Sequence, residues 1–246
     1  MSIALLELAA LTARADTIYV DDDAPNDPGP GDPLVSDPLE DGSAEHPFDA
    51  IQDAIDASFD GDEVVLADGT YTGDGNRDLS LSHGLPSGQT RAITVRSTSG
   101  DPNNCIIDCE GGGFGFDFYS GEGAGSVVAG MTITNGIVGG VFCFDSSPTL
   151  NDCRIAGNPG GGVSCWSSNA TLTNCTITGN TSDDGGGVCC SDSSSPTLSN
   201  CTITGNTADE GGGVYCSNRS NPTLSNCTIT GNTGGSGGGA YCSNSS

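Results

Sequence analysis

Four acidic residues recur at the same position of two neighbouring segments. Asp183 and Asp184 are followed 26 positions later by Asp209 and Glu210. If the two segments stack in one turn about 4.8 Å apart, the four carboxylates repel one another unless water screens them or a cation lies between them. Three interpretations follow: a solvated acidic turn, a Ca²⁺ site, and a catalytic carboxyl pair, because retaining glycosidases use a similar separation.

A second group of oxygen-bearing side chains lies further upstream. Asp74, Asn76 and Asp78 reproduce the D-x-N-x-D start of a calcium loop, but the Gly and the distal Glu of an EF-hand are missing. These residues are a second candidate Ca²⁺ site. Trp166, the one Trp of the chain, is a candidate for stacking on a sugar ring.

The charge balance restricts the partners of the protein. The 246 residues include 32 Asp and Glu but only 6 Lys and Arg, all of them Arg, which gives a formal net charge of −26. Such a surface repels phosphate backbones and anionic lipid, so we expect no nucleic-acid partner and no membrane insertion. With 39 Gly and 34% hydrophobic residues, the composition also argues against a conventional layered globule.

A repeat determines the predicted fold. The sequence Asn-Cys-Thr-Ile-Thr-Gly-Asn occurs at 174–180, 200–206 and 226–232, and a triple-Gly block with an apolar residue and a Cys lies between the copies. A period of about 22–27 residues with short alternating runs predicts one coil of a parallel β-solenoid, with three short strands and three turns. Cys201 and Ile203 should face inward, and Thr202 and Thr204 outward.

These motifs carry a family resemblance. The Ile-x-x-Asn and Gly-Gly-x-apolar pairs resemble the repeats of polymorphic outer-membrane proteins, within the pectin lyase-like class of right-handed parallel β-helices. Residues 17–71 also resemble the opening of secreted bacterial β-helix repeat proteins. The resemblance implies an all-β, right-handed, single-stranded β-helix. It implies no single function, because this class includes lyases, hydrolases, adhesins and passive spacers.

The chain divides into three predicted regions. Residues 1–15 contain a short apolar stretch and an A-x-A site, which is typical of a partial signal peptide and predicts a secreted or cell-surface protein. Residues 16–62 form an acidic segment and an amphipathic helix, with Pro47 in its first turn, that should cap the solenoid. Residues 63–246 form the β-helix. We expect the given sequence to be truncated within it, and further coils to follow in a longer protein.

Two ladders of inward Cys are expected to fill the narrow core. Their positions are Cys105, Met131, Cys153, Cys175, Cys201 and Cys227 in one ladder, and Phe116, Cys143, Cys165, Cys190, Cys216 and Cys242 in the other. Met and Phe each replace Cys at one step of a ladder, which favours packing over disulfides or metal ligation as the role of these Cys. Disulfides between neighbouring coils remain an alternative. Cys189 should point outward and be the reactive thiol.

A catalytic site is not apparent from the sequence. In the pectin lyase-like class, lyases need a basic residue beside a cation, and hydrolases need paired carboxyl groups. Neither of the two Arg in the regular repeats has an acidic partner in matching register. We therefore expect a structural, adhesive or ligand-presenting role with polysaccharide or another cell surface as partner. The alternatives are a polysaccharide lyase or glycoside hydrolase for an acidic polysaccharide, and a calcium-stabilised extracellular spacer.

Overall fold

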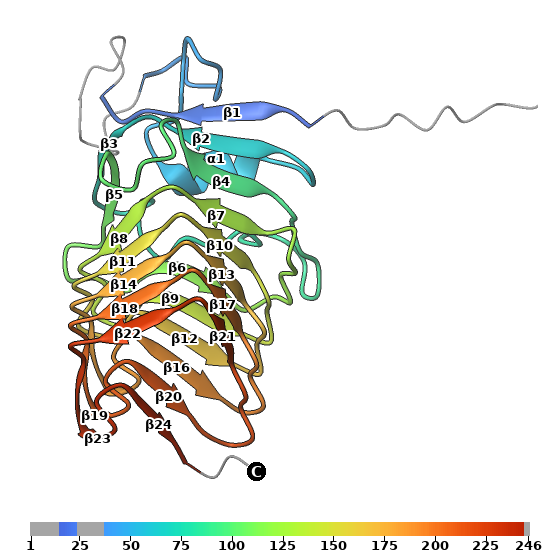
Figure 1. Cartoon of the computed structure of the whole chain (residues 1–246). Coiled ribbons are helices and arrows are strands. Elements are labelled where there is room, and N and C mark those ends of the chain that lie inside the picture. Colours follow the sequence, from blue (N-terminus) through green and yellow to red (C-terminus); the bar gives the residue numbers. More distant parts are fainter. Residues whose placement is uncertain (1–14, 24–36, 244–246) are drawn as a thin grey trace, which may run out of the picture.

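Short alternating runs, many of them followed by Gly, Asn or Ser, form the strands of a parallel β-solenoid (Figure 1). The computed structural model describes residues 15–23 and 37–243. The segment 1–14, which contains most of the predicted signal peptide, lies outside the described residues. In the part that is described, no helix is long and apolar enough to cross a membrane.

The strands form four parallel sheets along the solenoid axis. The first sheet contains, in spatial order, β1 (Thr17–Val20), β2 (Glu63–Leu66), β4 (Thr94–Ser97), β7 (Val127–Ala129), β10 (Thr149–Asn151), β13 (Thr171–Thr173), β17 (Thr197–Ser199) and β21 (Thr223–Ser225). The second contains β3 (Gly69–Tyr71), β5 (Cys105–Asp108), β8 (Thr132–Thr134), β11 (Arg154–Ala156), β14 (Thr176–Thr178), β18 (Thr202–Thr204) and β22 (Thr228–Thr230).

The third and fourth sheets complete each coil. The third sheet contains β6 (Phe114–Phe118), β9 (Gly139–Phe144), β12 (Val163–Trp166), β16 (Val188–Ser191), β20 (Val214–Cys216) and β24 (Ala240–Cys242). The fourth contains β15 (Thr181–Asp184), β19 (Thr207–Glu210) and β23 (Thr233–Ser236). The prediction of three strands in each coil is therefore wrong for the last coils, which have four.

Repeated residues stack directly on one another. Ile177 pairs with Ile203 in the second sheet, and Leu172 pairs with Leu198 in the first. Cys201 and Ile203 are buried, whereas Thr202 and Thr204 are partly exposed. The predicted parallel solenoid and its inward and outward faces are confirmed.

Two ladders of Asn stabilise the corners. At the outer ladder, Asn174, Asn200 and Asn226 adopt φ of 56°, 57° and 54°, and their amides bond from coil to coil at 3.3 and 3.4 Å. Asn tolerates this left-handed conformation better than most residues. The inner ladder is joined by amide-to-amide hydrogen bonds of 3.0 Å at each step, and it consists of the fully buried Asn158, Asn180 and Asn206 and the partly exposed Asn232.

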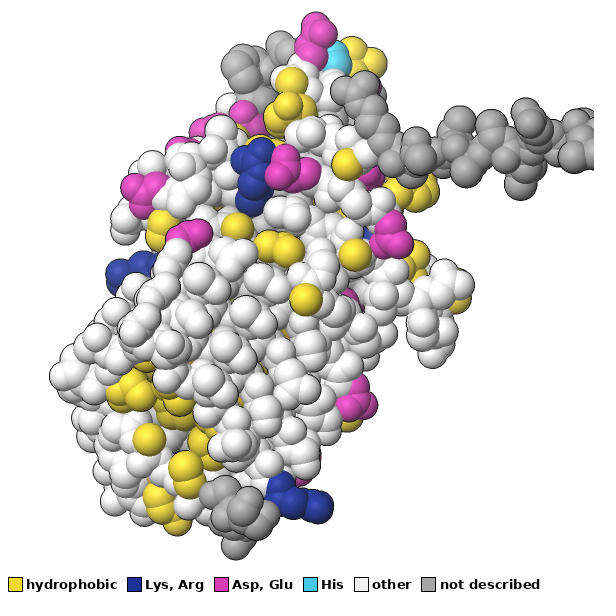
Figure 2. Space-filling view, turned by 45° about the vertical axis from the view of Figure 1, so that its right-hand side comes forward, with side chains coloured by type: hydrophobic (Ala, Val, Ile, Leu, Met, Phe, Trp, Pro, Cys, Tyr) yellow, Lys and Arg dark blue, Asp and Glu magenta, His cyan; other side chains and the backbone are white. Residues whose placement is uncertain are grey.

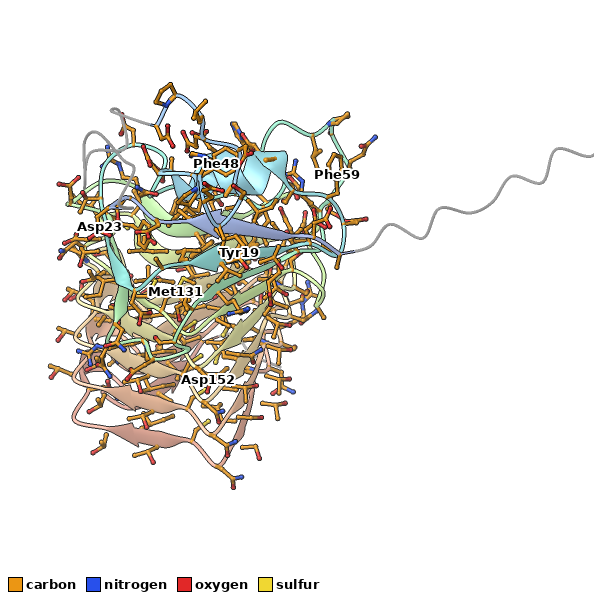
Figure 3. The ribbon with its side chains drawn as sticks, turned by 90° about the horizontal axis from the view of Figure 1, so that it is seen from above. Tyr19, Asp23, Phe48, Phe59, Met131 and Asp152 are labelled. Atoms are coloured by element: carbon orange, nitrogen blue, oxygen red, sulfur yellow. The ribbon has the colours of Figure 1, made fainter. Side chains whose placement is uncertain are left out.

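The predicted helix is present but shorter than expected. Helix α1 spans Ile51–Ala57, and the side-chain oxygen of Asn76 accepts a hydrogen bond from the first helical N–H, that of Ile51. Phe48 exchanges backbone hydrogen bonds with β1 instead of entering the helix, so the expectation of Pro47 in the first turn is wrong. Figure 3 shows Phe48 beside the helix. A capping role of this region stays a prediction.

Candidate functional site

The four repeated carboxylates lie on strands β15 and β19, not in a turn. Asp184 pairs in register with Glu210. Because successive side chains of a strand point to opposite faces, Asp183 and Asp209 form a second pair on the other face. The acidic residues therefore form two pairs rather than one group of four.

The pair of Asp183 and Asp209 faces a groove of about 510 Å³. The groove is lined by Thr181 and Thr207, which pair in register, and by Asp183 and Asp209. Two exposed apolar residues that lie two coils before β15, Ile137 and Val138, contribute to the wall. One hydroxyl and one carboxylate group thus recur on two consecutive coils, beside an apolar part of the wall.

The electrostatics of these strands are uniformly negative. Partial burial raises the pKa of the Asp184 carboxyl above its usual range, and the negative charges of Asp183 and Asp209 raise it further. Within residues 15–23 and 37–243, no Arg lines the groove. A cation bound here would relieve the repulsion, whereas an anionic ligand would increase it. Binding of Ca²⁺ by Asp183, Asp184, Asp209 and Glu210 stays a prediction.

The second predicted calcium site is divided among separate structural contacts. Arg77 forms an ion pair with Asp74, and the Asp78 carboxylate accepts a 2.8 Å hydrogen bond from the backbone N–H of Phe114. Asn76 is fully buried, and its amide also donates to the backbone of the preceding strand end. Each of the three residues therefore has a structural contact of its own. Calcium binding here is likewise an untested prediction.

A different acidic group was not singled out by sequence reasoning. Asp21, Asp22 and Asp23 follow β1, and one carboxylate oxygen of each lies within 4.8 Å of the others. Among the described residues, this is the one group of three or more His, Cys, Asp or Glu side chains close enough to share an ion. The D-D-D run in the sequence could have indicated it.

The cysteine ladders are built mainly as expected. All twelve Cys lie within the described residues and carry free thiols, in agreement with the packing interpretation. The register of the second ladder is corrected at one step, because Phe118 pairs with Cys143 and Phe116 pairs with Val141. Phe118, rather than Phe116, therefore occupies the Cys position.

Cys189 stacks between Ser164 and Tyr215 on the outward face as predicted, but the prediction that its thiol is reactive is wrong. Cys189 is only 7% exposed, and burial raises the pKa of its thiol to about 12. Gly185 lies so close that an added Cβ would stand 2.7 Å from the Cα of Cys189. The turn between β15 and β16 thus covers this thiol, and it is protonated at neutral pH.

The comparison with family models agrees with this architecture. The sequence model of the family described as "Right handed beta helix region" matches residues 118–246. No curated protein matches the sequence. Among solved structures, the crystal structure of pectate lyase Pel9A has a TM-score of 0.42 and 12% sequence identity, over 94% of this chain and 79% of the other.

Proposed function

The chain belongs to the right-handed β-helix family, and from that premise we propose that it is a secreted or cell-surface protein that binds extended polymers without transforming them. The signal-like segment at 1–15 supports the location. The resemblance of the repeats to those of polymorphic outer-membrane proteins is consistent with a surface role.

The groove on β15 and β19 is the observation that carries this proposal. Its hydroxyl pair, Thr181 and Thr207, and its carboxylate pair, Asp183 and Asp209, belong to consecutive coils about 4.8 Å apart. A polymer that runs along the axis meets the same hydroxyl and carboxylate groups on these two consecutive coils. Figure 2 shows that, on the face it presents, uncharged groups cover most of the lower coils.

Catalysis is less well supported than binding. A uronate lyase needs a basic residue at the carbon that loses its proton, and no Arg lines the groove in the described part of the chain. Carboxylates alone would repel an acidic polysaccharide. The groove therefore favours a neutral or cationic polymer.

Calcium stabilisation is a second candidate role. The in-register pair of Asp184 and Glu210, with the raised pKa of Asp184, supports it because a shared cation would offset the repulsion. Thermal unfolding with EGTA, Ca²⁺ or NaCl tests this role. A rise in Tm that is specific to Ca²⁺ and is lost in Asp184→Asn supports a site, and an equal rise with NaCl contradicts it.

Affinity electrophoresis tests the proposed function. The protein is run through native gels that contain a neutral glycan, chitosan or polygalacturonate, and the unsaturated uronate product is followed by absorbance in parallel. We expect retardation by a neutral or cationic polymer, and about tenfold weaker binding in the double variant Asp183→Asn, Asp209→Asn. Asp101→Asn, in an exposed turn, is the matched control. Release of unsaturated product, or no retardation by any polymer, would contradict the proposal.

A further inference from the structure

Three exposed aromatic residues lie on consecutive coils at the ends of third-sheet strands. Phe144 pairs in register with Trp166. Tyr119 directly follows Phe118, whose partner is Cys143, so it lies one coil before Phe144. The three side chains, here called the aromatic row, are 52%, 44% and 41% exposed for Tyr119, Phe144 and Trp166.

The rings of the aromatic row are not used for packing on one another. Elsewhere on the third sheet, Phe114 stacks on Phe142 with centroids 5.2 Å apart, and Tyr215 stacks on Tyr241 at 6.0 Å. No such ring pair joins members of the aromatic row, all of which are described. Their apolar faces are therefore open to a ligand, and grouped exposed apolar side chains mark binding surfaces.

A cavity of about 540 Å³ adjoins the first member of the row. Its walls are Tyr119, the following turn, Asp145 and the loop at 82–88. Ser82 lines this cavity, is only 5% exposed, and has a buried hydroxyl with no hydrogen-bond partner. A buried hydroxyl without a partner is costly, and a ligand hydroxyl could satisfy it.

The combination of ring faces, hydroxyls and one carboxylate defines the ligand class. A sugar ring presents an apolar C–H face to an aromatic ring and hydroxyls at its edge to Ser and Asp. Asp145 and the net charge of −26 disfavour a uronate. Coils about 4.8 Å apart place successive rings at a spacing near the length of one sugar unit.

We propose that Tyr119, Phe144 and Trp166 form a stacking site for a neutral glycan, with Ser82 and Asp145 as its polar contacts. This inference rests on the proposed polymer-binding function but adds a separate site. The groove lies near the start of the third-sheet strands, whereas the aromatic row lies at their ends.

Fluorescence of the single Trp tests the proposal directly. The full chain is titrated with neutral oligosaccharides, namely cello-, manno- and laminari-oligosaccharides, and binding to soluble neutral glycans is measured by affinity electrophoresis. We expect a shift of the Trp166 emission, about tenfold weaker binding in Trp166→Ala, and a larger loss when Phe144→Ala is added. Tyr19→Ala is the matched control, because Tyr19 is exposed on β1 in another sheet (Figure 3).

The outcomes separate the two proposals. If a neutral glycan retards the wild type and the variant Trp166→Ala, Phe144→Ala equally, the proposal of the aromatic row is overturned and polymer binding is retained. The proposal of the aromatic row is also overturned if Asp183→Asn and Asp209→Asn weaken the retardation and the glycan does not shift the Trp166 emission of the wild type. Absence of retardation by every polymer would overturn both. Far-UV circular dichroism of the double variant checks that the solenoid is retained.

Discussion

The coils before and after residue 127 are stabilised in different ways. The N-terminal coils contain the largest buried side chains, among them Tyr71, Phe116 and Phe118, and every ion pair recorded for the described residues. The C-terminal coils rely on ladders of identical small residues, as at Asn180 and Ser194. The irregular coils are thus stabilised by large side chains and ion pairs that differ from coil to coil. The regular coils are stabilised by the same hydrogen bonds repeated along the axis.

The largest effect is expected from interrupting the inner Asn ladder. Asn180→Ala removes hydrogen bonds to Asn158, Ile155 and Asn206 and leaves buried groups without partners. We expect a loss of about 4 kcal/mol in the free energy of unfolding, measured by urea denaturation. Asn103→Ala, in an exposed turn of the N-terminal coils, should cost less than about 0.5 kcal/mol. Equal costs would show that the ladders do not distinguish the two regions.

An intermediate effect is expected at one partly buried carboxyl of the N-terminal coils, that of Asp117. Burial raises the pKa of Asp117 to about 6, the charges of Asp78 and Glu122 add to it, and one Asp117 oxygen has no hydrogen-bond partner. The native state therefore holds its proton more tightly than the unfolded state, so stability falls as the pH rises from about 4 to about 6.

The variant Asp117→Asn removes this pH-dependent cost. We expect it to stabilise the protein at pH 7 by about 1 kcal/mol, a value reduced for solvent screening, and to flatten the profile below pH 6. Thermal unfolding from pH 4 to pH 7 measures both effects. Asp183→Asn, on an exposed strand of the C-terminal coils, is the control. A wild-type profile that rises over this range would contradict the expectation.

The smallest effect is expected from a surface ion pair that joins β2 and β4. Arg96 donates to both oxygens of Glu63 at 2.7 and 2.8 Å, and these hydrogen bonds lower the pKa of Glu63 and raise that of Arg96. Both side chains are partly exposed, so Arg96→Met should cost only about 0.5 kcal/mol, and less in high salt. A cost above that of Asn180→Ala would reverse the ranking of the two regions.

Sequence reasoning located the repeat but not its consequences at the surface. The motif of Cys201 and Ile203 was sufficient to predict which side chains face the core, because strand alternation is local. It failed at Cys189, since the turn that covers this thiol is recognised only when β15 is placed. It also treated Trp166 as isolated, because no local pattern joins it to Phe144, 22 positions earlier in the chain.

The sequence by itself therefore determined the coil, its period and its inward faces, since these depend on alternation and on which residues tolerate tight corners. Only the tertiary structure decided that the acidic residues divide into two pairs across β15 and β19, and that aromatic residues of different coils form one row. The physical reason is register. Residues more than twenty positions apart become neighbours only when the chain has completed a coil, and loop lengths that vary from coil to coil determine which ones meet.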